Sequence, residues 1–163
     1  MLALRYAGVL ALTLWVGGLL ALGAVAAPST FDVLAARHIA DNRVLAGAIF
    51  GETLRRFHLL SYGCAFVLLG TLVLRGVLGP RPVMFAARLV LVLAMLAATA
   101  YAGFVVSARI AGVQAQIGAA APSSLPEGDP RRVAFGRLHA TATGLEMVPI
   151  LGGLLLLFRE LKD

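Results

Sequence analysis

Hydrophobic residues in this chain gather in four long stretches, which are separated by shorter segments rich in polar and turn-forming residues. The stretches run Leu4–Ala27, Leu59–Leu78, Val83–Ser107 and Val133–Phe158. Each is close to or longer than the ~20 residues that an α-helix needs to cross the hydrocarbon core of a bilayer. The pattern therefore predicts an all-α fold, an integral membrane four-helix bundle.

The segment between the first two stretches has a different pattern. From Phe31 to Phe57, apolar residues recur at roughly helical spacing among charged residues. This spacing predicts an amphipathic interfacial segment between helices 1 and 2, and leaves open whether it continues into helix 2. Pro28 is expected to end the first helix. Trp15, Gly17 and Gly18 lie in that helix, where small residues allow a neighbouring helix to approach closely.

We expect a single transmembrane domain over residues 1–163. Its helices are predicted at approximately 4–27, 50–78, 83–116 and 131–159. Four crossings place both termini and the turn between helices 2 and 3 on one side of the membrane, here called side one. The other two connections lie on side two. Arginines and lysines are distributed almost evenly between the sides, so the charge pattern leaves the orientation open.

Composition supports a membrane location and narrows the classes of binding partner that we expect. The chain is 60% hydrophobic and 13% charged, against about 25% charged residues in soluble domains. The net charge of +6 comes mostly from arginines at helix ends, where they meet lipid headgroups. No basic run is interleaved with aromatic residues, so we expect no nucleic-acid partner. The expected partners are membrane lipid and a second copy or another membrane protein.

Polar residues gather near side two. His58 and His139 lie at the side-two ends of helices 2 and 4, so topology predicts a similar depth for both. Residues at i, i+3 and i+4 spacing share a helical face. Two such faces carry Arg55, His58 and Tyr62 on helix 2, and His139, Thr143 and Glu146 on helix 4. We expect these faces to form a polar pocket open toward side two.

Glu146 is the deepest acid of the predicted bundle. An ionisable residue inside lipid is costly, so it indicates a function or a specific partner. Tyr101, Trp15 and Tyr62 are its candidate hydrogen-bond partners. Arg88, near the side-one end of helix 3, is expected to extend to that surface instead.

Three functions fit these residues. The chain lacks a catalytic triad, a phosphate-binding loop, a cysteine cluster and an HExxH zinc motif, so we expect a non-enzymatic protein that binds or scaffolds a partner, a lipid or an ion. The first alternative is a haem-binding redox protein, with His58 and His139 as axial ligands and Arg55 and Arg56 near the propionates. The second alternative is proton or metal-ion transport that uses Glu146. The sequence leaves any metal undetermined.

Short motifs along the chain also resemble a known family. In chain order they are Trp15-x-Gly17-Gly18, Ala27-Pro28-x-x-Phe31, Ala46-Gly47 with Phe50, and Phe135-x-x-Leu138-His139. Together they resemble the transmembrane protein 205-like family, also called domain of unknown function 4149. The resemblance implies a four-helix integral membrane protein and little chemistry.

The Trp-x-Gly-Gly helix before a proline also resembles, more distantly, copper resistance protein D and the four-helix membrane protoporphyrinogen oxidase. As a location we expect the bacterial inner (cytoplasmic) membrane.

Overall fold

A computed structural model describes residues 2–37, 41–79 and 81–162, and all regular structure in these residues is helical. The elements are α1 (Leu2–Ala21), the π-helical η1 (Leu22–Ala26), α2 (Ala27–Ala36), α3 (Asn42–Leu78), α4 (Phe85–Ala100), the π-helical η2 (Tyr101–Val106), α5 (Ser107–Ile117), the 3₁₀ turn η3 (Pro122–Ser124) and α6 (Pro130–Lys162).

Consecutive helices join into four continuous rods in the described part of the chain. Each rod is long and apolar enough to cross a membrane: Leu2–Ala36, Asn42–Leu78, Phe85–Ile117 and Pro130–Lys162. The apolar surface of these rods requires lipid contact. The protein is therefore an integral membrane four-helix bundle, as the hydrophobic pattern predicts.

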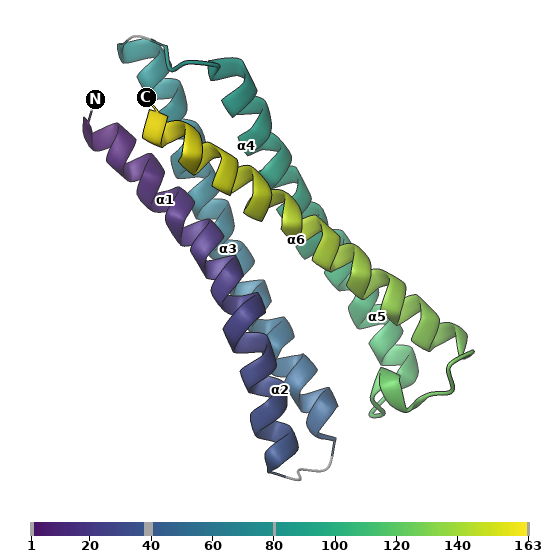
Figure 1. Cartoon of the computed structure of the whole chain (residues 1–163). Coiled ribbons are helices and arrows are strands. Elements are labelled where there is room, and N and C mark those ends of the chain that lie inside the picture. The colour runs from purple at the N-terminus through teal and green to yellow at the C-terminus, as the bar shows by residue number, and fades with distance from the viewer. Residues whose placement is uncertain (1, 38–40, 80, 163) are drawn as a thin grey trace.

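The rods form a ring in which α1 packs on α3 and α6, and α4 packs on the same two helices. Both ends of the chain and the turn between α3 and α4 lie together at one end of the bundle (Figure 1), which is side one. Toward the other end, α2 packs on α3 and α5 packs on α6. These two pairs diverge in Figure 1, and we call them the α2–α3 arm and the α5–α6 arm.

The apolar core occupies the half of the bundle nearer side one. Its fully or nearly fully buried members come from all four rods: Leu12, Trp15, Val16, Ala65, Val92, Met95 and Ile150. By contrast, α2 and α5 contain no buried residue within the described chain. The bundle is thus tightly packed at side one and open between its arms at side two.

Glycines set the close approaches in the core. An added Cβ at Gly153 would lie 2.2 Å from Cγ2 of Val16, and one at Gly18 would lie 2.2 Å from Cε2 of Phe57. Both glycines therefore let a side chain of a neighbouring helix pack directly against their backbone. Gly17 faces open space instead. Of the predicted packing motif, Trp15 is fully buried while Pro28 and Phe31 are exposed.

A slab without charge separates the two ends of the bundle. Residues 6–31, 59–74, 89–108 and 147–158 contain no Asp, Glu, Lys or Arg. On α6 this slab is bounded by Glu146 and Arg159, which lie about 20 Å apart along the helix at 1.5 Å per residue. The hydrocarbon core of a bilayer is about 30 Å thick. Glu146 and Arg159 therefore mark the two ends of the charge-free part of α6, and both arms extend past its side-two end.

Two expectations about the first half of the chain are wrong. The first helix does not end at Pro28, which lies in the first turn of α2 within one continuous rod. The π-helical turns of η1 precede it directly. The second wrong expectation is that helix 2 starts near residue 50. The first part of the amphipathic stretch continues the first rod, and its second part runs into helix 2, a continuation that the sequence left open, so that α3 begins at Asn42.

The last rod begins at a capped Asp-Pro pair. The Asp129 carboxylate accepts a hydrogen bond from the backbone N–H of Arg131 at 2.8 Å, as an N-cap residue does. Pro130 follows at the first helical position, where proline is favoured. The Arg131 guanidinium and backbone N–H hold the pKa of Asp129 down to about 2. The cap is therefore charged at any physiological pH.

Candidate functional site

The main polar contact inside the bundle joins α3 to α6. Nε2 of His58 lies 2.7 Å from Oε1 of Glu146, and the two side chains are 5% and 13% exposed. A contact of this length between an imidazole nitrogen and a carboxylate is a strong hydrogen bond in either protonation state of the histidine. The pair links α3 and α6, the two rods that lie diagonally across the ring, at the level where the arms separate.

The second oxygen of the same carboxylate has no partner. Oε2 of Glu146 is buried and makes no hydrogen bond to any described residue. A buried carboxylate oxygen without a donor is unfavourable by a few kcal/mol, and such atoms are uncommon in native structures. Pro149 adds a further acceptor, because it has no N–H to donate to the carbonyl of Leu145. This region therefore has an excess of acceptors over donors.

Aromatic side chains and a glycine hold the histidine in place. The Tyr62 ring lies 6.5 Å from the His58 ring and stacks on Phe104 at 5.5 Å. Gly103, within η2, approaches both polar rings. A Cβ added there would lie 2.6 Å from the Tyr62 hydroxyl and 2.9 Å from Nδ1 of His58. π-Helical turns are frequent at functional sites, and this one brings the backbone of Gly103 against His58.

We expect Gly103→Ala to displace the His58 ring and weaken its contact with Glu146, because the new methyl group overlaps both polar side chains. The ring nitrogen signals of His58 in NMR spectra should shift. Gly112→Ala, at a helical glycine on the same rod with open space around it, is the matched control and should leave them unchanged. Unchanged His58 signals in the Gly103 variant would refute this packing.

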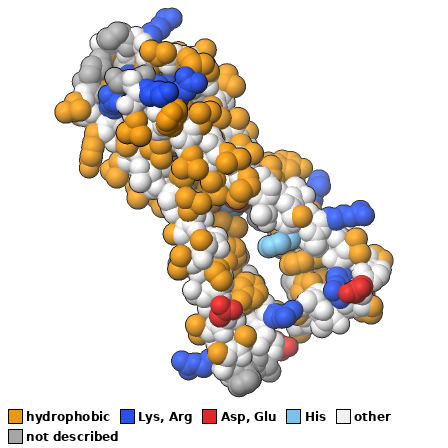
Figure 2. Space-filling model, in the orientation of Figure 1, with side chains coloured by type: hydrophobic (Ala, Val, Ile, Leu, Met, Phe, Trp, Pro, Cys, Tyr) orange, Lys and Arg blue, Asp and Glu red, His pale blue; other side chains and the backbone are white. Residues whose placement is uncertain are grey.

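The pair lies at the apex of the opening between the arms. His58 is sixteen residues from the start of α3, and Glu146 is sixteen residues from the start of α6. Figure 2 shows the two arms separated by an open cleft at the side-two end of the molecule. At the far end of the arms, Arg43 donates a hydrogen bond to the Ser123 hydroxyl at 3.0 Å, from the start of α3 to η3. The cleft thus has an apex at Glu146 and a polar contact between its tips.

The structure brings together only part of the predicted pocket. His58, Tyr62 and Glu146 lie close to one another, whereas Arg55 and Arg56 are exposed and bind Glu52. His139 and Thr143 are exposed on α6, and the Thr143 hydroxyl donates to the backbone carbonyl of His139. Tyr101 is 45% exposed, and the buried Trp15 indole N–H has no partner among the described residues.

The predicted similar depth of the two histidines is wrong. His58 pairs with Glu146, which lies seven residues past His139 on the same helix, about 10 Å deeper. Topology alone predicts that both imidazoles lie near side two, but the length of the α2–α3 arm puts His58 further inside. The third histidine, His38, lies outside the described residues. No group of three or more His, Cys, Asp and Glu side chains suited to a metal occurs in the described chain.

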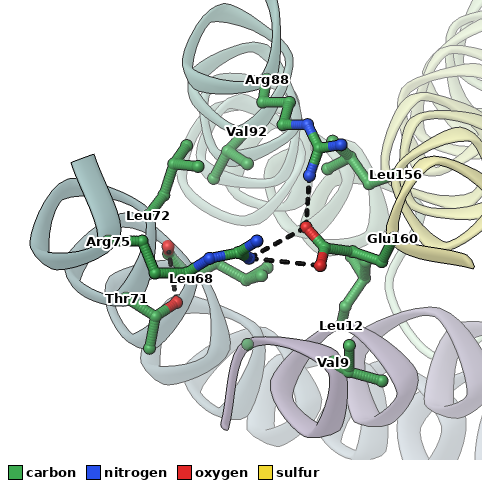
Figure 3. A pocket seen from close by; sticks show the side chains of 11 residues that line it. Val9, Leu12, Leu68, Thr71, Leu72, Arg75, Arg88, Val92, Leu156 and Glu160 are labelled. Atoms are coloured by element: carbon green, nitrogen blue, oxygen red, sulfur yellow. Dashed lines mark hydrogen bonds and ion pairs between the residues drawn. The ribbon is translucent and has the colours of Figure 1, made fainter. Parts of the chain in front are cut away.

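A second polar cluster, at side one, was not predicted. Arg5, Arg75 and Arg88 all contact the carboxylate of Glu160. Figure 3 shows Arg75 and Arg88 converging on it from α3 and α4. The expectation that Arg88 extends to the surface is therefore wrong, since its side chain is 5% exposed and is drawn inward by Glu160. The signal available in the sequence is that each of these residues lies two or three positions from a helix end.

Comparison with known proteins gives a family but no function. No curated protein and no solved structure matches the chain. The closer likeness to transmembrane protein 205, and the distant one to copper resistance protein D and protoporphyrinogen oxidase, stay predictions. A family match covers residues 10–119, which include His58 but neither Glu146 nor the Phe135-x-x-Leu138-His139 motif. Because the match spans more than half of the chain, the protein belongs to the family described as Domain of unknown function (DUF4149).

Proposed function

We propose that this protein is a non-enzymatic binding protein of the membrane. Its ligand carries a positively charged or hydrogen-bond-donating group, enters the cleft between the two arms from side two, and reaches Glu146 at the apex. The observation that carries the proposal is the buried, unpartnered Oε2 of Glu146. A donor from a ligand would satisfy this oxygen while Oε1 keeps its contact with His58.

The surroundings of the cleft favour an amphiphilic ligand. The arms carry large exposed apolar side chains, among them Val33 and Phe31 on α2 and Val133 on α6. The arms also carry charged side chains, such as Glu52, Arg55 and Arg56 on α3. A ligand with an apolar body and one polar group fits walls of this mixed kind, as pockets for small molecules are mostly apolar with a few placed polar groups.

The same geometry favours binding over transport. A cation or proton that left Glu146 toward side one would have to cross the charge-free slab, which is about 20 Å thick along α6. Charge in such a region is unfavourable. The haem alternative gains no support, because Nε2 of His58 is engaged by Glu146 and His139 lies nearer side two. An oligomer and a bacterial inner-membrane location stay predictions.

Binding of a lipophilic cation tests the proposal. We expect rhodamine 6G, a fluorescent cation with N–H donors, to bind saturably to the protein in phosphatidylcholine nanodiscs. Glu146→Gln should weaken this binding about tenfold, the effect of one lost charge-assisted hydrogen bond. Fluorescence anisotropy measures the affinity.

Glu127→Gln is the matched control, because it removes an exposed acid from the loop before α6 without touching the apex. Its affinity should stay within about twofold of the unmodified protein, as for surface substitutions in general. Equal affinities of the Glu146 variant and the unmodified protein, or purely non-saturable uptake, would contradict the proposal.

A further inference from the structure

The cluster at side one concentrates guanidinium groups on a single carboxylate. Arg75 Nη1 lies 3.0 and 3.2 Å from the two oxygens of Glu160. Nε of Arg5 lies 3.4 Å from Oε2, and Arg88 contacts Oε1. Arg5 also donates to the backbone carbonyl of Glu160. One acid is therefore shared by three arginines from three different rods.

The donors of this cluster outnumber the acceptors even without Arg88. A guanidinium carries five N–H donors and a carboxylate only acceptor sites. Arg75 uses Nη1 for both of its bonds to Glu160, which leaves the N–H groups of Nε and Nη2 for other acceptors. These N–H groups of Arg75 are donors that an additional anion could accept from.

The cluster lies at the depth of lipid headgroups. Arg5, Arg75 and Arg88 are each three residues from the side-one end of their helix, and Glu160 is two residues from the end of α6. One turn of helix is about 5.4 Å, so all four lie within one turn of the side-one ends of their helices, where basic side chains meet lipid headgroups. Figure 2 shows Lys and Arg side chains gathered at this end of the molecule.

A small cavity adjoins the cluster. It has a volume of about 30 Å³ and is lined by polar groups of Arg75, Arg88 and Glu160 above apolar side chains that include Leu12 and Val92. Figure 3 shows these side chains arranged around the opening. A space of this size holds about two water molecules, so it is too small to enclose a larger anion. An anion would instead bind at the open end, where Arg5 is 37% exposed.

From this geometry we infer that the side-one cluster binds a phosphate group, that of a membrane phospholipid. Guanidinium groups match phosphate oxygens with paired, parallel N–H bonds. Basic pockets between transmembrane helices bind the headgroups of anionic lipids. The site is independent of the cleft at side two, and its ligand would order the ends of α1, α3 and α4 around Glu160.

Lipid retention tests this inference. The protein is reconstituted with equal amounts of phosphatidylglycerol and phosphatidylcholine, extracted in mild detergent, and examined by native mass spectrometry. We expect one phosphatidylglycerol to remain bound. Arg75→Gln should lower the retained fraction about tenfold, as expected for one charge-assisted bond. Arg5→Gln, at the exposed rim, should also lower the retained fraction. This second variant tests the inference even if the Arg75 variant fails to fold.

Arg81→Gln is the matched control, because it removes the same charge from an exposed position on the same side. Retention should stay within about twofold of the unmodified protein. A parallel measurement follows thermal unfolding in lipid-free detergent with inorganic phosphate or with chloride at equal ionic strength. Lipid retention without an effect of phosphate identifies the lipid as the source, and stabilisation by phosphate alone identifies the free anion.

Two results would overturn the inference. One is that Arg81→Gln lowers retention as much as Arg75→Gln, which would mean that net charge alone attracts the lipid. The other is that neither phosphatidylglycerol nor inorganic phosphate has any effect on the unmodified protein.

Discussion

Replacement of Glu160 by alanine is expected to lower the free energy of unfolding by about 3–5 kcal/mol, the usual effect of removing one partner of a buried ion pair. Glu160 is the shared acceptor of Arg5, Arg75 and Arg88, and its side chain is 14% exposed. Without Glu160, three guanidinium groups from three rods would face one another with no carboxylate between them. Unfolding of the detergent-solubilised protein by heat or SDS, followed by circular dichroism, measures the change.

The control for this experiment is Glu127→Ala. Glu127 is a side chain that is 94% exposed and lies 3.9 Å from Arg132 in the loop before α6. Exposed pairs of this kind contribute about 0–1 kcal/mol. If the two variants lost stability equally, Glu160 would have no special role in joining the rods at side one.

Gly153→Ala should destabilise the bundle by about 1–3 kcal/mol, the range for overpacked cores. The new methyl group would overlap Cγ2 of Val16 at 2.2 Å, whereas Leu12 and Met95 would lie at ordinary contact distances of 3.4 and 3.5 Å. Valine is stiff because it is branched at Cβ, so Val16 has little freedom to turn away and α1 would have to move from α6.

For a second glycine on the same helix, we expect the opposite effect of alanine on stability. Gly144 faces open space, so Gly144→Ala should be neutral or stabilising by up to about 1 kcal/mol, since alanine favours helix more than glycine does. The two substitutions are chemically identical, but the unfolding temperatures of the two variants should differ. Gly153→Ala should lower the unfolding temperature, and Gly144→Ala should leave it unchanged or raise it. A shift of both in the same direction and by the same amount would argue against the close packing of α1 on α6.

The fold was predictable because the strongest signal in the chain is the one that lipid imposes. Four apolar stretches of sufficient length require four helices, and the four rods of the described chain follow them. The ends of the rods were less predictable. Pro28 looks like a terminator, but the π-helical η1 lies directly before it and the rod continues through it to Ala36.

The site was predictable in its helical faces but not in its pairing. Spacing alone puts His58 beside Tyr62 on one helix and identifies Glu146 on another. Which of them meet depends on how far each rod extends past the membrane edge, and that length is set by the amphipathic arms. The sequence therefore could not predict that His58 contacts Glu146 instead of lying level with His139.

The side-one cluster shows a different limit. Arginines near helix ends usually extend toward lipid headgroups, and the expectation for Arg88 follows this rule. The rule takes no account of Glu160, a single acid three turns past Pro149 at the end of α6. Because the four rods converge at side one, one carboxylate there can collect three guanidinium groups, and pairing overrides extension to the surface.

The pairing of His58 with Glu146 is the central claim of this account, and solid-state NMR tests it most directly. The protein in lipid is labelled with ¹⁵N in histidine and ¹³C in the glutamate carboxyl groups, and nitrogen–carbon dipolar dephasing is recorded. We predict one strongly dephased histidine nitrogen that disappears in both His58→Gln and Glu146→Gln but persists in His139→Gln. Absence of that signal, or its loss in the His139 variant alone, would contradict the account.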